Sequence, residues 1–203
     1  MNEKFFDLKK EKQDRIINAA LKVFALNGFQ RASTDEIVKE ASISKGLIFH
    51  YFTSKLGLYS FLYDYSTRFM TLEVTTNVPK DETDVFALLE KILEAQSDAM
   101  SQYPYIQAFI RRAYSENDSN ALEQISDTRM RYFNMYSEIM RQADMSKFRD
   151  DVDYRMIGAM LEYTCEGILN ERAQREKIVP EEYFNEIKKY LFLLKNIAYK
   201  EDM

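Results

Sequence analysis

The sequence predicts an all-α fold: a three-helix N-terminal domain with a helix-turn-helix, followed by a larger helical domain, about nine helices in all. Apolar residues recur at helical intervals along the 203-residue chain, and no segment alternates as a strand does. Pro79, Pro104 and Pro180 stand where these helical patterns stop or start. Residues 33–55 combine helix-start signals with a tight turn.

Residues 33–52 are expected to form the helix-turn-helix. Ser33 and Glu36 have the spacing of a capping box, so a short helix should begin at Ser33. The segment 42–44, Ser-Ile-Ser, interrupts this helix and can cap the next one. The second helix should then run from Lys45 to about Phe52. We refer to this second helix as the recognition helix.

The recognition helix has one inward and one outward face. Ile48 and Phe52 share a face, whereas Gly46 and His50 lie on the opposite one. Small or polar groups near a helix N-terminus, with Lys45 beside them, suit insertion into a DNA major groove. The helix that follows begins at residues 53–55, where amide N–H groups and a lysine suit a phosphate. The expected DNA contacts are Thr34, Ser44, Lys45, Gly46, Leu47, Phe49, His50, Tyr51 and Lys55.

A wider set of spaced residues carries a family resemblance. It comprises Ile16, Ile17, Ala19, Ala20, Val23, Phe24, Gly28, Phe29, Thr34, Ile37, Ala41, Ser44, Lys45, Gly46, His50, Tyr51, Phe52, Lys55, Leu58 and Tyr59. As a set, these residues resemble the helix-turn-helix of the TetR/AcrR family of bacterial transcriptional regulators, over about the first quarter of the chain. Ser42 departs from the usual turn glycine, at an expected small strain cost. Leu47 replaces a small polar residue and favours a thymine-methyl contact or none.

The resemblance implies a homodimer in which residues 1–54 bind DNA and residues 55–203 dimerise and sense a ligand. It implies a repressor that occupies a palindromic operator and is released by a small, largely apolar effector. A helical regulator controlled by a protein partner, or an activator, stays open as an alternative. Gly28 is expected to end the first helix. Tyr51 either packs against that helix or donates its hydroxyl to a phosphate.

The charge distribution agrees with DNA binding by one end of the chain. The whole chain has a net charge of −5, which by itself argues against a nucleic-acid partner. Residues 1–55, however, carry ten Lys/Arg against seven Asp/Glu, about +3, and the rest carries 18 against 26, about −8. Such a separation is expected when only one end faces phosphate.

The remaining composition argues against several other classes. With one histidine, one cysteine (Cys165) and no glycine-rich phosphate loop, an enzyme would have to rely on carboxylates alone, so we expect no catalytic site, metal or cofactor. No apolar run reaches transmembrane length, and the N-terminus lacks the apolar region of a signal peptide. We therefore expect a cytoplasmic protein with no membrane partner.

The last two helices carry more apolar surface than one chain needs to cover. The remaining helices are expected at 55–76, 83–102, 104–115, 119–145, 151–176 and 180–199. Apolar side chains surround helix 180–199 almost completely, and helix 151–176 is similar, with Gly158 and Gly167 allowing close approach. A two-fold four-helix interface would bury both, unless both faces pack within one chain. The expected interface residues are Leu161, Cys165, Ile168, Ile187, Leu191 and Leu194.

Aromatic and methionine side chains are abundant between residues 59 and 163. Singly they suit a core, and together they suit an adaptable apolar pocket with tyrosine hydroxyls and Gln96 as polar anchors. The family resemblance implies such a pocket between helices 55–76 and 151–176. Glu162 and Glu166 either solvate their helix or pair with a cationic aromatic ligand. The expected pocket residues are Tyr65, Phe69, Gln96, Met100, Phe109, Tyr136, Tyr163 and Glu166.

Overall fold

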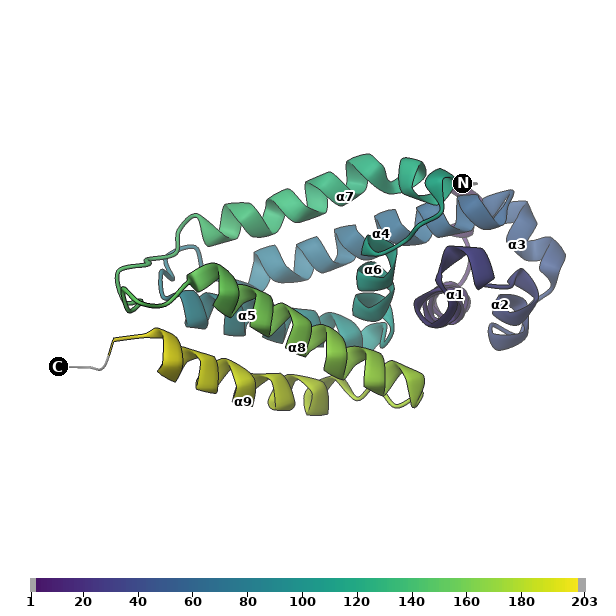
Figure 1. The fold of residues 1–203 in the computed structure, drawn as a ribbon. Coiled ribbons are helices and arrows are strands. Elements are labelled where there is room, and N and C mark those ends of the chain that lie inside the picture. The colour runs from purple at the N-terminus through teal and green to yellow at the C-terminus, as the bar shows by residue number, and fades with distance from the viewer. Residues whose placement is uncertain (1–2, 201–203) are drawn as a thin grey trace. The chain divides into compact units, whose positions relative to one another are not determined.

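The computed structural model describes residues 3–200 and confirms the all-α prediction (Figure 1). Nine α-helices, one short 3₁₀ helix and no strand are found in this range. The elements are η1 (Glu3–Phe5), α1 (Lys10–Arg31), α2 (Thr34–Glu40), α3 (Lys45–Phe52), α4 (Lys55–Asn77), α5 (Val85–Gln102), α6 (Ile106–Tyr114), α7 (Ser119–Met140), α8 (Tyr154–Gln174) and α9 (Pro180–Ala198). No helix in the described range is long and apolar enough to cross a membrane.

The helix-turn-helix forms with the predicted bounds. The Ser33 hydroxyl accepts a hydrogen bond from the Asp35 amide at 3.2 Å and caps α2. Ser44 stands at the N-cap of α3, but its hydroxyl makes no capping bond there. Ser42 adopts a φ of 52°, in the left-handed region that glycine tolerates best. The predicted strain at this turn position is therefore present in the backbone.

Gly28 ends the regular helical path of α1, as expected. Its φ of 69° and ψ of 177° are non-helical and produce a kink, and a short helical stretch follows as far as Arg31. A Cβ atom at this position would lie 3.0 Å from Nη2 of Arg112. Glycine is thus favoured here by the backbone angle, whereas the Arg112 side chain could move aside.

The connection between α7 and α8 is longer than predicted. We expected a helix to residue 145, but α7 ends at Met140. The amide of Asp144 instead donates to the carbonyl of Thr83 at 2.8 Å, and that of Arg149 to the carbonyl of Ala198 at 2.9 Å. Since these amides bond other segments, they cannot extend a helix. Asp153 then caps α8 through the Arg155 amide at 2.9 Å.

The chain packs as two compact units. One comprises residues up to 69 together with 102–132, and the other residues 70–101 together with 133 onward. The helices α4, α5 and α7 each contribute to both units. The predicted functional boundary at residue 54 stays a prediction, because compact packing does not define which residues bind DNA.

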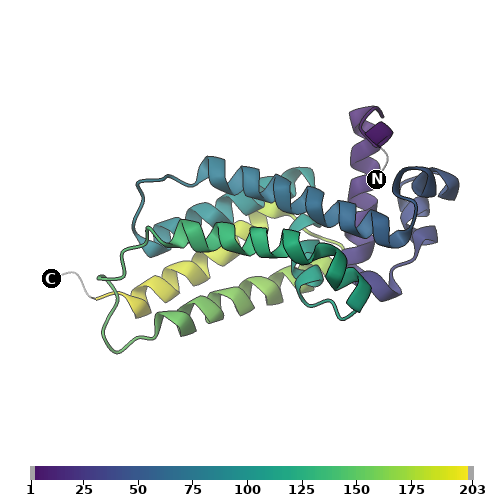
Figure 2. The ribbon, with the colours of Figure 1, turned by 90° about the horizontal axis from the view of Figure 1, so that it is seen from above.

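Each unit has its own apolar core. In the first, the rings of Phe24 and Phe109 enclose Tyr59, with centroid distances of 5.1 and 5.5 Å to that tyrosine. In the second, α8 and α9 lie side by side, as Figures 1 and 2 both show. Their facing residues Leu161, Cys165, Leu169, Tyr183, Ile187, Leu191 and Leu194 are all buried.

Candidate functional site

The outward face of the recognition helix α3 is exposed as predicted. Lys45, Gly46, Phe49 and His50 are exposed, while the side chains on the opposite face are buried. A Cβ atom at Gly46 would meet no atom within 4 Å, so the backbone is open to a close approach there. The structure therefore places small, basic and aromatic groups together on one accessible surface.

Three further expected contacts lie at the edges of this surface. Ser44 is exposed, whereas Thr34 and Leu47 are half-buried. The ammonium of Lys45 lies 2.8 Å from a carboxylate oxygen of Asp35. Both side chains are exposed, and such a pair contributes little stability in water, so a DNA phosphate can compete for the lysine.

Lys55 bonds backbone carbonyls of its own chain. Its ammonium donates to the carbonyls of Phe29, Gln30 and Ala32 at 2.8, 3.2 and 3.2 Å. It also lies 4.6 Å from the centroid of the Phe29 ring. The three donors of this ammonium are thus used on backbone carbonyls around the end of α1. Within the chain, the positive charge of Lys55 stabilises the C-terminal end of a helix, and its contact with a phosphate stays a prediction.

Tyr51 packs inside the protein, against the ring of a residue in the N-terminal segment. Only 8% of the residue is exposed. Its ring lies 5.7 Å from that of Phe5 in η1 and 4.9 Å from that of His50. The ring of Tyr51 therefore packs on the N-terminal segment, and a contact of its hydroxyl with a phosphate stays a prediction. Nothing in the sequence pattern marked Phe5, because it precedes the helix-turn-helix.

The residues predicted for the dimer interface are already buried within one chain. Leu161, Cys165, Ile187, Leu191 and Leu194 fill the contact between α8 and α9, and Ile168 is half-buried beside it. Their part in a dimer interface stays a prediction, and a second copy would more readily contact the residues of these helices that are left exposed. The exposed apolar residues of these two helices are Tyr154, Met156, Met160, Tyr163, Tyr190, Phe192, Leu193 and Ile197.

The residues predicted for the ligand pocket are divided between the two compact units. The amide of Gln96 donates to the hydroxyl of Tyr136 at 2.9 Å, and both belong to the second compact unit with the buried Met100. Tyr65 and Phe69 stack with their ring centroids 6.4 Å apart in the first unit. The buried Phe109 belongs to that unit too, and Glu166 is half-buried on α8.

Tyr163 does not line an enclosed site in the single chain, which corrects its assignment. It is 72% exposed, on the same outer side of α8 as Met156 and Met160. Helical spacing alone cannot distinguish the two apolar faces of such a helix, because both satisfy the same period.

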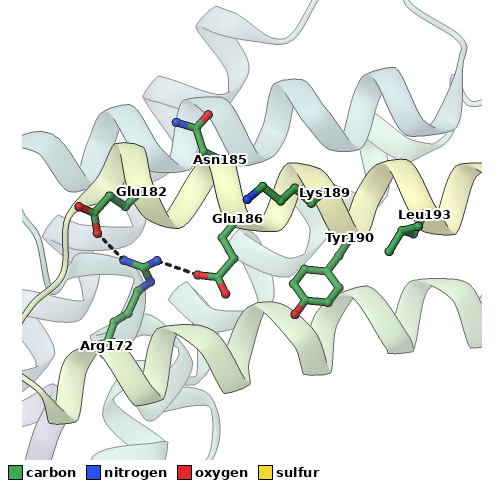
Figure 3. Close-up of a pocket in the computed structure, with 7 residues that line it drawn as sticks. All are labelled: Arg172, Glu182, Asn185, Glu186, Lys189, Tyr190 and Leu193. Atoms are coloured by element: carbon green, nitrogen blue, oxygen red, sulfur yellow. Dashed lines mark hydrogen bonds and ion pairs between the residues drawn. The ribbon is translucent and has the colours of Figure 1, made fainter.

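An open groove of about 630 Å³ lies along α9 (Figure 3). Arg172 of α8 crosses to α9 and pairs with Glu182 at 3.2 Å and Glu186 at 2.7 Å. The groove is lined by Arg172, Glu182, Asn185, Glu186, Lys189, Tyr190 and Leu193. None of the predicted pocket residues contributes to it, so we do not assign it to the effector.

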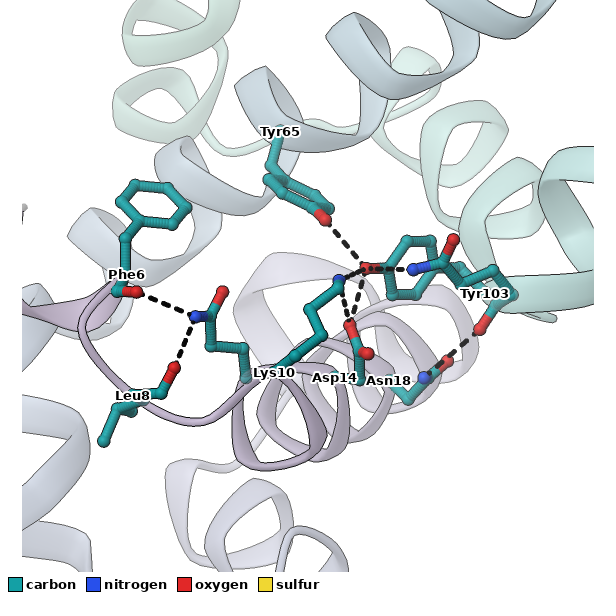
Figure 4. Close-up of polar contacts among 9 residues, drawn as sticks. Phe6, Leu8, Lys10, Asp14, Asn18, Tyr65 and Tyr103 are labelled. Carbon is teal, nitrogen blue, oxygen red and sulfur yellow. Dashed lines mark hydrogen bonds and ion pairs between the residues drawn. The ribbon is translucent and has the colours of Figure 1, made fainter.

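A buried polar cluster around Tyr103 was not predicted (Figure 4). The Tyr103 hydroxyl lies 2.7 Å from the Asp14 carboxylate, 2.9 Å from the Lys10 ammonium and 2.7 Å from the Tyr65 hydroxyl. Burial, together with hydrogen bonds to Tyr65 and Asp14, raises the pKa of Tyr103. The neutral phenol therefore joins the beginning of α1 to α4 and to the end of α5.

Comparison with known proteins identifies the N-terminal region. A family model described as "Bacterial regulatory proteins, tetR family" matches residues 16–60. The uncharacterized HTH-type transcriptional regulator YuxN of Bacillus subtilis is 38% identical over 92 residues. That alignment covers 42% of this chain and 32% of YuxN, so the chain spans about a third of this relative.

Solved structures extend the likeness to the whole fold. A TetR family transcriptional regulator from Chloroflexus aurantiacus matches with a TM-score of 0.63 and 21% identity, over 98% of this chain and 99% of that one. FadR from Bacillus subtilis, solved in complex with stearoyl-CoA, matches with a TM-score of 0.60 and 16% identity, over 89% and 96% of the two chains. At these identities the likeness shows the fold. Taken with the family match over residues 16–60, it places the N-terminal region of the chain in the TetR family of bacterial regulatory proteins.

Proposed function

We propose that the protein is a transcriptional repressor that binds a palindromic operator as a dimer and leaves it when a small effector binds. The observation that carries this proposal is the recognition helix α3. Its exposed face presents Lys45, Gly46, Phe49 and His50, while Ile48 and Phe52 anchor it in the core. This surface suits a major groove, with the lysine for phosphate and the imidazole and phenyl rings for base edges.

The dimer would form through the outer faces of α8 and α9. Met156, Met160 and Tyr163 are 63%, 47% and 72% exposed on α8, and Phe192 and Leu193 are 65% and 56% exposed on α9. Apolar residues gathered on two neighbouring helices favour association with a second copy. A two-fold axis through this face would present two recognition helices, and the operator would then be an inverted repeat.

The effector site would involve α5 and α7 of the second compact unit. Beyond Ile125, no residue of α7 as far as Met140 is fully buried, so this half of the helix can shift without opening a tightly packed core. Gln96 and Tyr136 offer a polar anchor beside the buried Met100. The FadR structure contains stearoyl-CoA, which supports an effector with an acyl chain as the first compound to test.

Release would follow from a movement of α4. This helix begins directly after the recognition helix and continues to Asn77, so it takes part in both compact units. An effector that binds more tightly when α4 is displaced would change the spacing of the two recognition helices in the dimer. Repression requires no further contact, because a dimer bound over a promoter excludes the polymerase. As an operator-binding protein it would act in the cytoplasm.

The test is a binding titration in both directions. Operator DNA selected from a genomic pool is titrated with the protein, with and without a long-chain acyl-CoA and other apolar compounds. We expect an effector to weaken operator binding about 5- to 150-fold, and operator to weaken effector binding by the same factor. Transcription of the bound promoter in vitro should fall with protein and recover with effector. A rise on protein addition would instead identify an activator, and release only by a second protein would exclude the small-molecule effector.

A further inference from the structure

The N-terminal segment before α1 inserts a phenylalanine beneath the recognition helix. Phe5 of η1 is fully buried. Its ring lies 5.7 Å from that of Tyr51 and 5.0 Å from that of Phe52, both on α3. It also lies 5.3 Å from the ring of Phe61 on α4. Aromatic pairs at these distances add to the stability gained from burial alone.

The recognition helix is short and also packs against α2. It is eight residues long, and its buried residues are Ile48, Tyr51 and Phe52. A helix of this length is not stable by itself, so its orientation depends on what packs against its buried side. Phe5 contacts two of the three buried residues. It therefore covers much of the surface by which α3 is held.

The backbone around Phe5 is fixed from α1. The buried side chain of Gln13 donates to the carbonyl of Phe6 at 3.0 Å and to that of Leu8 at 2.7 Å. Figure 4 shows these two carbonyls converging on the first turns of α1. An amide that bonds two carbonyls two residues apart holds the segment in one conformation.

A second anchor holds the start of α1 itself. The ammonium of Lys10 bonds the Asp14 carboxylate at 2.6 Å and the Tyr103 hydroxyl at 2.9 Å. Tyr103 in turn bonds Tyr65, whose ring lies 5.8 Å from that of Phe61. The segment is thus tied at its beginning to α3 and α4, and at its end to the polar cluster around Tyr103.

We propose that residues 5–14 form a clamp that sets the orientation of the recognition helix, with Phe5 as its positioning residue. Phe5 supports Tyr51, and the Tyr51 ring lies 4.9 Å from that of His50 on the outward face of α3. A shift of the Phe5 ring is transmitted to the side chains that face the major groove. The clamp's effect on DNA binding rests on the proposed function, whereas its effect on α3 does not.

The experiment compares Phe5→Ala with Phe6→Ala in the full chain. Phe6 is the matched control, because it is 50% exposed and its ring contacts those of Phe5 and Phe61 but none on α3. For Phe5→Ala we expect faster hydrogen exchange of the α3 amides, unchanged exchange in α8 and α9, and about tenfold weaker binding to selected operator DNA. Binding to random DNA should change less. Phe6→Ala should leave all four measurements near those of the wild type.

Two further variants keep the proposal testable if Phe5→Ala fails to fold. Phe5→Leu retains an apolar side chain and should restore most of the α3 protection, whereas Gln13→Leu keeps the core filled but releases the carbonyls of Phe6 and Leu8. Gln13→Leu should therefore show the same loss as Phe5→Ala in weaker form. Unchanged α3 exchange in Gln13→Leu, with unchanged operator affinity, would overturn the clamp. If the wild type selects no DNA, the proposed function fails, while the exchange comparison still decides whether α3 is held by Phe5.

Discussion

Tyr103 and Asp14 are separated by 89 positions in the sequence, yet the phenol of one donates to the carboxylate of the other at 2.7 Å. Lys10, Tyr65 and Gln102 bond the same hydroxyl. A single oxygen atom thus connects the first turn of α1 to α4 and to the end of α5. The loss of this atom tests how firmly α1 is held.

Replacement of Tyr103 by phenylalanine should destabilise the protein. The ring would stay in place, but Asp14 and Tyr65 would lose a buried partner. We expect a loss of about 1–3 kcal/mol in the free energy of unfolding, measured by urea denaturation at pH 7. Asn18→Ala is a suitable control, because its amide makes only a long 3.4 Å bond to the Gln102 carbonyl. An unchanged midpoint for Tyr103→Phe would show that the cluster contributes nothing to stability.

The same tyrosine predicts a loss of stability at alkaline pH. Burial raises the pKa of Tyr103, so the unfolded phenol loses its proton at a lower pH than the folded one. The contribution is therefore fully present below the unfolded value of about 10 and is lost as pH rises above it. Burial also raises the pKa of Tyr63 and of Tyr199 to about 12, so the wild type should be destabilised in steps above pH 10. Tyr103→Phe should show a smaller slope of stability with pH in this range.

Asp84 predicts a loss at the acidic end. Burial alone would raise its pKa, but hydrogen bonds from the Lys147 ammonium and the Ala87 amide, with the charge of Lys195, lower the pKa to about 2. Its carboxylate also caps α5 through the amides of Phe86 and Ala87, each at 3.1 Å. Asp84→Ala should cost about 1 kcal/mol at pH 7.

The pH dependence of this loss provides the check on Asp84. Its contribution should be complete above the unfolded pKa of about 4 and should vanish as pH falls through about 2. Thermal unfolding of the wild type and Asp84→Ala should therefore converge on acidification. A difference that is the same at pH 7 and at pH 2 would mean that the carboxylate charge has no part in it.

Two charged substitutions on α8 and α9 should separate dimerisation from folding. Met160→Glu places a charge on the exposed face, so the protein should remain folded but sediment as a monomer. Leu191→Arg places a charge in the buried contact between α8 and α9, and it should unfold the chain, because an unpaired buried charge costs several kcal/mol. Sedimentation and circular dichroism distinguish the two. A dimer that survives Met160→Glu, together with a similar result for Phe192→Lys, would place the interface elsewhere.

Lys45 and Lys55 should differ in how they affect DNA binding. Lys45→Ala removes an exposed charge on the outward face of α3. It should therefore weaken binding to DNA of any sequence and lower the slope of log affinity against log salt by about one. Lys55→Ala removes the cap on the end of α1, so it should lower thermal stability and leave the salt slope unchanged. If Lys55→Ala instead lowers the salt slope and leaves stability unchanged, Lys55 contacts a DNA phosphate and does not act as a helix cap.

The fold was predictable where local signals agree with tertiary packing. The capping residue Ser33 and the alternating faces of α3 are local features, and both form as expected. The role of Lys55 was not predictable, because its carbonyl partners lie 23 to 26 residues earlier in the chain. The interface residues of α8 and α9 could not be selected from the sequence for a related reason. A helix that is apolar on both sides gives no local signal to distinguish the face against α9 from the face left exposed.

The N-terminal segment and the polar cluster had no signal at all in the sequence pattern. Phe5 lies before the first segment with helical periodicity. Tyr103 is next to Pro104, and that proline indicates only a helix boundary. Their contacts arise only when α1 packs next to α4 and the end of α5. The roles of such residues can be assigned only when the fold is known.

The selection of DNA by the purified protein tests the central claim most directly. A random or genomic pool is bound, recovered and sequenced, with His50→Ala as the parallel sample. We predict enrichment of an inverted repeat whose half-sites lie about 34–36 Å apart, or somewhat more if two dimers share the site. His50→Ala should relax the preference at one base position, at a cost of about 1–3 kcal/mol. Enrichment of direct repeats, of single half-sites or of no sequence would contradict a two-fold dimer that reads DNA with α3.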